Sequence, residues 1–139
     1  MKIDGYGQAK ILTTQEIEAL FALENSNARD RALYAVMLYT ACRVSEAIPL
    51  RKRDVYDNKG KVRPFILFRK PTTKGKLATR EIPVIEDLRI HLEAYQPRKK
   101  TPFLFPGQLG NSREYTHLHK DSALWLLRQA CKKIGLEGI

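Results

Sequence analysis

The chain of 139 residues has a hydrophobic fraction of 43%, which predicts one soluble globular domain with a core of its own. It contains no run of about 18 apolar residues and no basic start followed by an apolar stretch, so we expect no membrane span and no secretory signal. The formal net charge is +10, and residues 51–80 contribute most of it with eleven basic and two acidic side chains. A block so one-sided favours a polyanionic partner, of which nucleic acid is the commonest.

The two cysteines, Cys42 and Cys131, both lie in apolar helical patterns. No Cys-x-x-Cys motif and no Cys/His ligand spacing accompanies them, so we expect no metal site. We expect both side chains to be free thiols in the reducing environment of the cytoplasm.

The first third of the chain is predicted to be mainly helical. Residues 1–12 form an extended lead-in, and Thr13 with Glu16 has the spacing of a capping box that begins a first helix. A second helix begins near Ala28 and is apolar on every side, which is typical of a central buried helix. A third, short helix begins near Val44.

The middle of the chain is predicted to form strands. Apolar and β-branched residues at 53–56, 64–68 and 79–84 indicate three of them, and the Asp-Asn-Lys-Gly sequence at 57–60 predicts a turn after the first. The expected fold class is therefore α+β, mainly helical with a small three-stranded antiparallel sheet.

Two further helices are predicted after the sheet. An amphipathic helix begins near Ile85, and a final helix runs from about His119 to Ile134, after a polar loop over 107–115. We expect Trp125 in this last helix to pack in the interior rather than to stack on a nucleobase.

Arg43 and Glu46 stand one helical turn apart, directly after the apolar second helix. One interpretation is an ordinary ion pair at a helix end, which contributes little when it is exposed. The other is an arginine whose planar fork grips two phosphate oxygens while Glu46 fixes its direction. The local sequence does not decide between the two.

Lys74 lies in the short basic hairpin Thr-Thr-Lys-Gly-Lys at 72–76. Hairpin lysines often serve only to keep a strand edge soluble. A lysine here could also donate a proton to a departing alkoxide, and Gly75 allows the backbone to approach a ligand closely. Lys76 is an equal candidate from position alone.

Histidines and tyrosines give weaker signals. His117 and His119 have no carboxylate or cysteine at ligand spacing, so we expect them to be loop or helix-start residues that contact DNA. Tyr34, Tyr39 and Tyr95 fit core positions, and no tyrosine lies in a context that marks a nucleophile.

The order of these motifs resembles the tyrosine recombinase (phage integrase) family, in the N-terminal part of its catalytic domain. Residues 40–46, Thr-Ala-Cys-Arg-Val-Ser-Glu, are similar to the family's first box, usually Thr-Gly-x-Arg-x-Ser-Glu. Residues 73–84 resemble its lysine-bearing hairpin and closing strand, and Phe-Leu-Phe-Pro at 103–106 resembles its Leu-Phe-Pro segment. The opening at 11–17 looks like the start of that domain, and the final helix like the one before its second box.

This resemblance implies roles for three side chains. Arg43 corresponds to the first catalytic arginine, Glu46 supports the site, and Lys74 is the hairpin lysine that acts as general acid. In the family, a tyrosine attacks the DNA phosphodiester and forms a 3′-phosphotyrosyl link without metal, ATP or another cofactor. The implied partner is double-stranded DNA rather than a membrane, and the whole protein is expected to assemble as a tetramer on paired DNA sites.

We expect further DNA contacts from the basic block and from the residues around the final helix. The candidates are Arg51, Arg53, Arg69, Lys70, Lys76, Arg80, Arg113 and His119.

The chain departs from the family's pattern in two ways. Ala41 stands where glycine is usual, which predicts a slight backbone shift near Arg43. The His-x-x-Arg box and the nucleophilic tyrosine do not occur within residues 1–139, so we expect a partial catalytic domain that cannot cleave DNA alone. Such a chain would be an engineered piece or a truncated gene product.

Three functions therefore compete. The first is the DNA-binding part of a site-specific recombinase, in which Arg43 and Lys74 converge on one basic face. The second is a stand-alone basic module that binds nucleic acid without catalysis. The third is a structural protein whose basic face meets a ribosome or another acidic partner. Neither of the last two requires that convergence.

Overall fold

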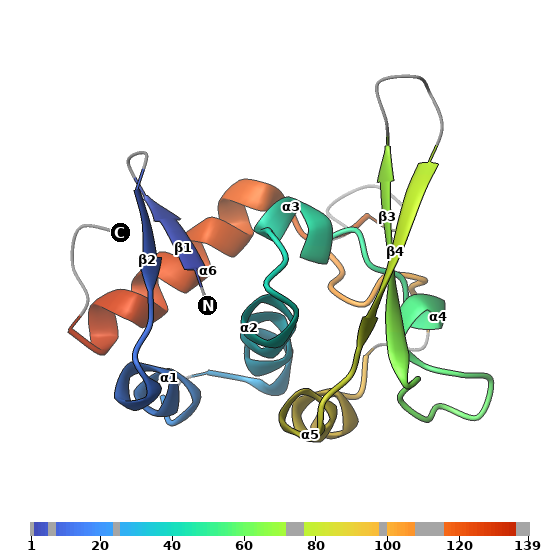
Figure 1. The fold of residues 1–139 in the computed structure, drawn as a ribbon, viewed down its shortest axis with the longest axis horizontal. Helices are drawn as coiled ribbons and strands as arrows, with labels where there is room; N and C mark the ends of the chain where they lie inside the picture. Colours follow the sequence, from blue (N-terminus) through green and yellow to red (C-terminus); the bar gives the residue numbers. More distant parts are fainter. Residues whose placement is uncertain are drawn as a thin grey trace.

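The computed structural model describes residues 2–5, 8–23, 26–71, 77–97, 100–107 and 116–135. Helices are its main regular elements, and a hairpin of two longer strands stands at one end (Figure 1). The elements in chain order are β1 (Lys2–Gly5), β2 (Gln8–Ile11), α1 (Thr14–Phe21), α2 (Ala28–Thr40), α3 (Val44–Ala47), α4 (Lys52–Val55), β3 (Phe65–Pro71), β4 (Leu77–Pro83), α5 (Glu86–Ala94) and α6 (Lys120–Lys133).

The predicted lead-in is extended, and it also pairs with itself. β1 and β2 form an antiparallel two-stranded sheet in which Lys2 lies opposite Ile11. Each strand has only four residues, so neither provides a long enough alternation to indicate pairing from sequence.

The predicted capping box begins α1. The N–H of Thr13 donates to Glu16 Oε1 at 2.8 Å, and the N–H of Glu16 donates to Thr13 Oγ1 at 3.2 Å. The helix then turns Leu20 into the core, where it is fully buried. The sequence thus determines this helix start through two reciprocal hydrogen bonds.

The central position of α2 is confirmed. The side chain of Asn27 caps its start by accepting the N–H of Asp30 at 2.8 Å, and its residues 32–37 are all buried. Figure 1 shows α2 between α1 and α5, and α2 packs extensively against α5. A helix surrounded in this way needs apolar residues on every side, which is the pattern that its sequence has.

The strand expected at 53–56 is wrong, because these residues belong mostly to helix α4. The carboxylate of Asp54 accepts the N–H of Arg51 at 3.0 Å and so caps the start of a helical turn. Only Tyr56 takes part in strand-like pairing, as an isolated bridge to Val62. A local cap therefore overrides the β-propensity of Val55 and Tyr56.

The other two predicted strands pair antiparallel as β3 and β4, so this sheet has two strands rather than three. Phe68 lies opposite Arg80 in the register. The predicted turn at 57–60 is present: Asp57 Oδ1 accepts the N–H groups of Lys59 and Lys61. Those hydrogen bonds lower the pKa of the exposed Asp57 carboxyl.

The last two helices, α5 and α6, lie close to where they were predicted. In α6, Ala123, Leu127 and Cys131 are buried in the core. Trp125 is not: its side chain is 61% exposed, because it lies on the outer face of the same helix. The prediction that Trp125 packs in the interior is therefore wrong.

One apolar core connects these elements. Its fully buried members come from α1, α2, β3, α5, α6 and the segment after Pro102, and include Leu20, Leu33, Ile66, Leu88, Leu127 and Phe105. In the described part of the chain, no helix is both long enough and apolar enough to cross a membrane.

Candidate nucleic-acid interface

Arg43 is exposed at the start of α3, between two buried residues. Cys42 and Val44 on either side are 6% and 8% exposed, so the backbone at Arg43 is anchored while its side chain faces outward. Among the described residues, no carboxylate lies within ion-pair distance of the Arg43 guanidinium. Its five N–H donors are therefore oriented toward solvent rather than toward a protein partner.

The link from α2 to α3 bends sharply at Ala41. This residue ends α2 in the left-handed conformation, with φ 56° and ψ 25°. The hydroxyl of Thr40 donates to the Val36 carbonyl at 2.6 Å and accepts the N–H of Cys42 at 3.3 Å. These two hydrogen bonds fix the backbone on both sides of Ala41. They hold Ala41 in the left-handed conformation, which alanine rarely adopts.

Glu46 connects α3 to the sheet with both carboxylate oxygens. Oε1 accepts the backbone N–H of Arg43 at 3.1 Å, and Oε2 pairs with Arg80 Nη2 at 3.0 Å. The Arg80 guanidinium also lies over the ring of Phe68, 5.3 Å from its centroid. Of the two interpretations of this spacing, the ion pair between Glu46 and the Arg43 side chain is not formed; the second oxygen of Glu46 pairs with Arg80 instead.

Arg51 sits in a short backbone ladder. The N–H of Lys52 donates to the Pro102 carbonyl and the N–H of Leu104 donates to the Leu50 carbonyl, both at 2.9 Å. This ladder brings Phe103 opposite Arg51, and the guanidinium lies 5.2 Å from the centroid of that ring. The aromatic face supports the arginine without neutralising its charge.

Asp54 plays the same part for Arg51 that Glu46 plays for Arg43. Its Oδ2 accepts the N–H of Arg51 at 3.0 Å, and its Oδ1 lies 3.1 Å from Arg69 Nη2. The second contact is an ion pair whose angles do not meet those of a hydrogen bond. Asp54 is 4% exposed, so Arg69 supplies the charge that this buried carboxylate requires.

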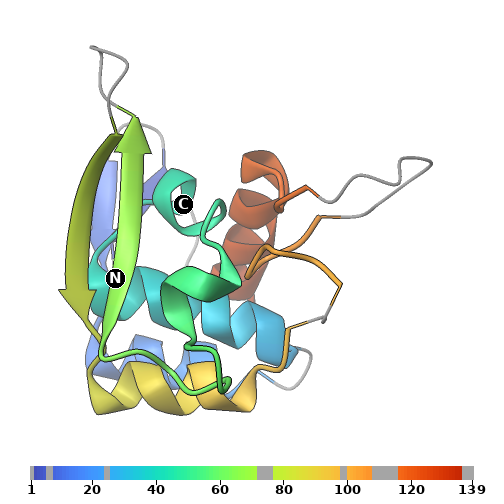
Figure 2. The same cartoon turned by 90° about the vertical axis from the view of Figure 1, so that its right-hand side faces the viewer.

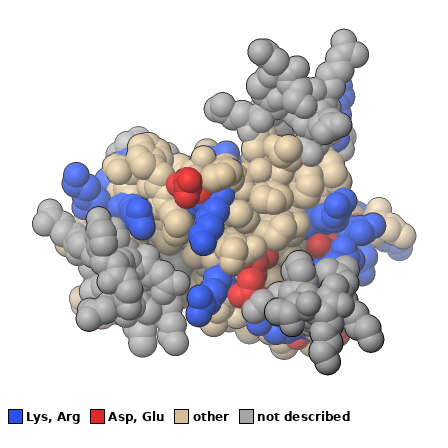
Figure 3. Space-filling model, turned by 90° about the horizontal axis from the view of Figure 1, so that it is seen from above, with Lys and Arg blue, Asp and Glu red and all other residues tan. Residues whose placement is uncertain are grey.

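A groove of about 860 Å³ lies between α3, α4 and the sheet; Arg51, Asp54 and Arg69 line it, whereas Arg43 and Arg80 do not. Figure 2 shows α3 above α4 with β3 and β4 beside them. From above, basic side chains gather most densely at the β3–β4 end, with acidic ones among them (Figure 3). The charged and aromatic residues that line the groove are Glu46, Arg51, Arg53, Asp54, Arg69, Phe103 and His117.

Two other arginines of the basic block have different environments. Arg53 is exposed at the groove, consistent with a contact to a ligand. Arg63 instead donates from Nε to the carbonyls of Arg53 and Tyr56, at 2.8 and 3.1 Å. Arg63 therefore braces α4 and the turn that follows.

His119 lies outside the groove. It caps α6, where its Nδ1 accepts the N–H of Asp121 at 3.1 Å. It lines a second hollow of about 790 Å³ together with Arg29 and the exposed Trp125. His117 lines both hollows and contacts Phe103 edge to face, 5.7 Å between ring centroids.

The predicted hairpin lysines Lys74 and Lys76, and the predicted DNA contact Arg113, lie outside the described residues. Lys70 lies on β3, where it is opposite Ala78 in the register. The predicted convergence of Arg43 and Lys74 therefore stays a prediction. The structure does bring Arg51, Arg53 and Arg69 together, and it links Arg43 to Arg80 through Glu46.

Sequence reasoning missed the roles of Asp54 and Phe103. The signal for Asp54 was present, because Arg51-x-x-Asp54 repeats the spacing of Arg43-x-x-Glu46. Phe103 gave no such signal, since only the ladder from Leu50 to Leu104 brings it under Arg51.

Cys42, Tyr56 and Tyr95 are buried or half-buried. Burial raises the pKa of the Cys42 thiol to about 11, so the thiol stays protonated at neutral pH. The hydroxyl of Tyr56 donates to the Leu92 carbonyl and that of Tyr95 donates to the Leu104 carbonyl, both at 2.7 Å. Burial also raises the pKa of Tyr56 well above its usual value.

In the same described ranges, no group of three or more His, Cys, Asp or Glu side chains is placed to hold a metal ion. The acidic side chains of the groove, Glu46 and Asp54, are instead taken by arginines.

The sequence profile of the Phage integrase family matches residues 10–138, and the chain belongs to this family of tyrosine recombinases. Among solved structures, the chain is similar to the crystal structure of XerA recombinase, with a TM-score of 0.66 and 22% sequence identity. That similarity covers 99% of this chain and 46% of the XerA chain, so the chain spans less than half of that recombinase. A comparison with curated protein sequences found no match.

Proposed function

We propose that this chain is the arginine-bearing, DNA-binding part of a site-specific recombinase catalytic domain. In a whole recombinase it would act in DNA strand cleavage and rejoining through a 3′-phosphotyrosyl intermediate. The observation that carries the proposal is the outward-facing Arg43, whose backbone is held by Glu46 and whose guanidinium has no carboxylate partner among the described residues. Membership of the family makes DNA the expected polyanion.

Arg43 would act on the phosphate under attack. Its planar fork can donate two parallel hydrogen bonds to two non-bridging oxygens and so stabilise the charge that develops on them. Its backbone is fixed by Glu46 and by the buried residues on either side, which lowers the cost of orienting it. Lys74 remains the proposed proton donor to the departing 5′ oxygen, with Lys76 as its alternative.

The groove would hold the DNA backbone beside that phosphate. Arg51 and Arg53 project into it, and Phe103 supports the Arg51 guanidinium. Such phosphate contacts position a duplex without reading its sequence. We propose that whole recombinases of this kind assemble on paired DNA sites as tetramers.

The nucleophile would come from a tyrosine other than those described in the core. Tyr34, Tyr56 and Tyr95 are buried or half-buried, and their hydroxyls each donate to a main-chain carbonyl. Because the family's His-x-x-Arg box also does not occur within residues 1–139, we expect these residues to bind duplex DNA without cleaving it.

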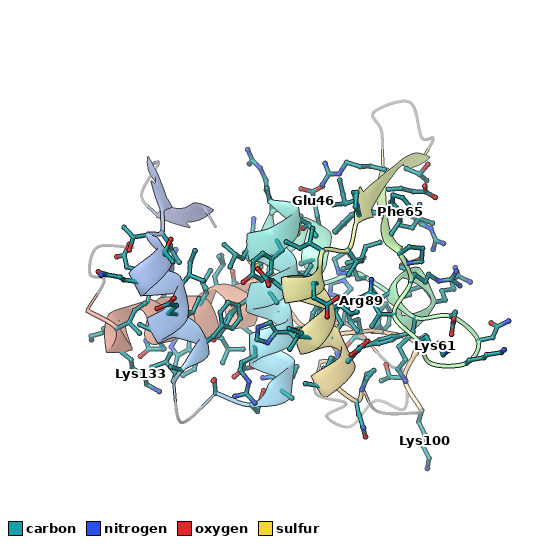
Figure 4. The ribbon with its side chains drawn as sticks, turned by 60° about the horizontal axis from the view of Figure 1, so that its bottom comes forward. Glu46, Lys61, Phe65, Arg89, Lys100 and Lys133 are labelled. Atoms are coloured by element: carbon teal, nitrogen blue, oxygen red, sulfur yellow. The ribbon has the colours of Figure 1, made fainter. Side chains whose placement is uncertain are left out.

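Duplex binding can be measured by fluorescence anisotropy over a salt series. If about four to six phosphates are contacted, the log–log slope of affinity against salt should be near −4 to −5. Arg43→Ala should weaken binding roughly tenfold and make the slope less negative by about 0.9. Lys133→Ala is the matched control, because Lys133 is an exposed cation on α6 at the far end of the molecule (Figure 4).

A flat salt response would contradict DNA binding, and equal losses for Arg43→Ala and Lys133→Ala would contradict the role of Arg43. Incubation with a nicked duplex, followed by a denaturing gel, tests the absence of cleavage. A covalent protein–DNA band would show that one of the tyrosines within 1–139 is a nucleophile.

A further inference from the structure

We infer that Arg80 and Arg69, which the sequence indicates as DNA contacts, are instead positioning residues for the two phosphate-binding arginines Arg43 and Arg51. This inference rests on the proposed function, since it takes DNA phosphate as the ligand of Arg43 and Arg51. It gives these four arginines two different roles: Arg43 and Arg51 bind phosphate, and Arg80 and Arg69 hold the carboxylates that fix them.

Two matching clusters support this division, and we call them the first and the second clasp. In the first, Glu46 accepts the N–H of Arg43 at 3.1 Å and pairs with Arg80 at 3.0 Å. Each contact uses a different carboxylate oxygen, so the carboxylate cannot rotate without losing one of them.

In the second clasp, Asp54 accepts the N–H of Arg51 at 3.0 Å and lies 3.1 Å from Arg69. The spacing from arginine to acid is three residues in both clasps, and both acids follow an arginine that starts a short helix. The strand arginines come from β3 and β4, the two strands of the same sheet.

The distribution of charge within the clasps also supports this division of roles. The carboxylates of Glu46 and Asp54 balance Arg80 and Arg69, whereas among the described residues Arg43 and Arg51 have no ion pair. Arg80 is further held over the ring of Phe68. Arg51 also lies over an aromatic ring, so the difference between the two is the ion pair: Glu46 balances the charge of Arg80 and occupies its Nη2, whereas the charge of Arg51 stays available to a phosphate.

The test is a set of double-mutant cycles on duplex affinity and on its salt slope. Arg80→Ala should weaken binding roughly three- to tenfold in the wild-type background. In the Arg43→Ala background it should have no further effect on affinity or on slope, because the contact that Arg80 supports is already lost. The cycle of Arg69→Ala with Arg51→Ala should behave in the same way.

Crossed pairs provide the control. Arg80→Ala with Arg51→Ala, and Arg69→Ala with Arg43→Ala, join residues of different clasps, so their effects should add. Arg80→Lys keeps a cation for Glu46 and should stay within about threefold of wild-type affinity. A thermal melt shows whether the Arg80→Ala variant is folded. If that variant does not unfold cooperatively, Arg80→Lys takes its place in the cycle.

The inference would be overturned if the losses of affinity within a clasp were additive and the salt slope decreased in magnitude by about a further 0.9. Such a result would show that Arg80 or Arg69 contacts phosphate directly. That outcome leaves the proposed function intact. Loss of salt-dependent binding in the wild-type chain would contradict the proposed function itself, so the two failures are distinguishable.

Discussion

Two regions of the molecule differ in the interactions that stabilise them. The helical region consists of α1, α2 and α6, and the arginine region consists of α3, α4, β3 and β4. The helical region depends on apolar burial, with α2 covered on every side. The arginine region adds charge-assisted contacts, in which Glu46 and Asp54 tie the short helices to the sheet. Burial fixes where an element lies but not the direction of an exposed side chain. Directional contacts are needed where an exposed arginine must point at a ligand.

The largest expected effect tests the helical region alone. Leu33 on α2 is 1% exposed, so Leu33→Ala should lower the free energy of unfolding by about 2–5 kcal/mol through lost burial and a cavity. Chemical denaturation measures this loss. The affinity of the folded fraction for duplex DNA should not change.

Ile90 provides the control for Leu33, because it is a large apolar residue that is 53% exposed on α5. Ile90→Ala should change stability by less than about 0.5 kcal/mol. A loss of DNA affinity in the folded Leu33→Ala variant would mean that the two regions are coupled more closely than their contacts indicate.

The next effect concerns Ala41, in the link between the two regions. Ala41→Gly should raise the free energy of unfolding by about 1 kcal/mol, because glycine adopts the positive φ of this residue without the steric cost to Cβ. Ala22→Gly is the matched control: Ala22 ends α1 in the right-handed conformation, where glycine should be neutral or destabilising. Equal signs for the two changes in denaturation midpoint would contradict strain at Ala41.

The smallest effect concerns pH and the contact of α5 with the helical region, where His91 meets Phe21 of α1. Burial lowers the pKa of His91, which stacks on Phe21 at 4.3 Å between ring centroids, and Arg31 lowers it further. The folded state therefore binds this proton less readily than the unfolded state. The stability that His91 contributes should be complete above its ordinary pKa of 6.5 and lost as the pH falls below it.

Thermal melts from pH 8 to pH 5 test this, with His91→Gln as the comparison, over a range flanking the ordinary histidine pKa of about 6.5. Below pH 6.5, the melting temperature of the variant should fall less than that of the parent. Parallel curves for parent and variant would assign the decline to other groups.

Local signals in the sequence predicted most of the helices. The Thr13–Glu16 capping box and the apolar run of α2 each determine their element through contacts within a few residues. The strand expected at 53–56 failed because the side chain of Asp54 caps a helical turn there. That cap overrides the β-propensity of neighbouring residues, so propensity alone gave the wrong element.

The site was predictable in part for the same reason. The spacing of Arg43 and Glu46 indicated a fixed arginine, and the basic block indicated a polyanion-binding face. What Glu46 contacts could not be read from spacing, because Arg80 lies 34 residues away along the chain. The role of Lys74 stays a prediction, and the sequence does not decide between Lys74 and Lys76.

The ladder around Arg51 also has a mechanical consequence. Its hydrogen bonds join Leu50 and Lys52 to the segment from Pro102 to Leu104, and the hydroxyl of Tyr95 joins that segment to the end of α5. A pull on Arg51 from a bent or twisting duplex would therefore pass along stiff backbone contacts into α5. Because α5 packs on α2, the load would end in the apolar core.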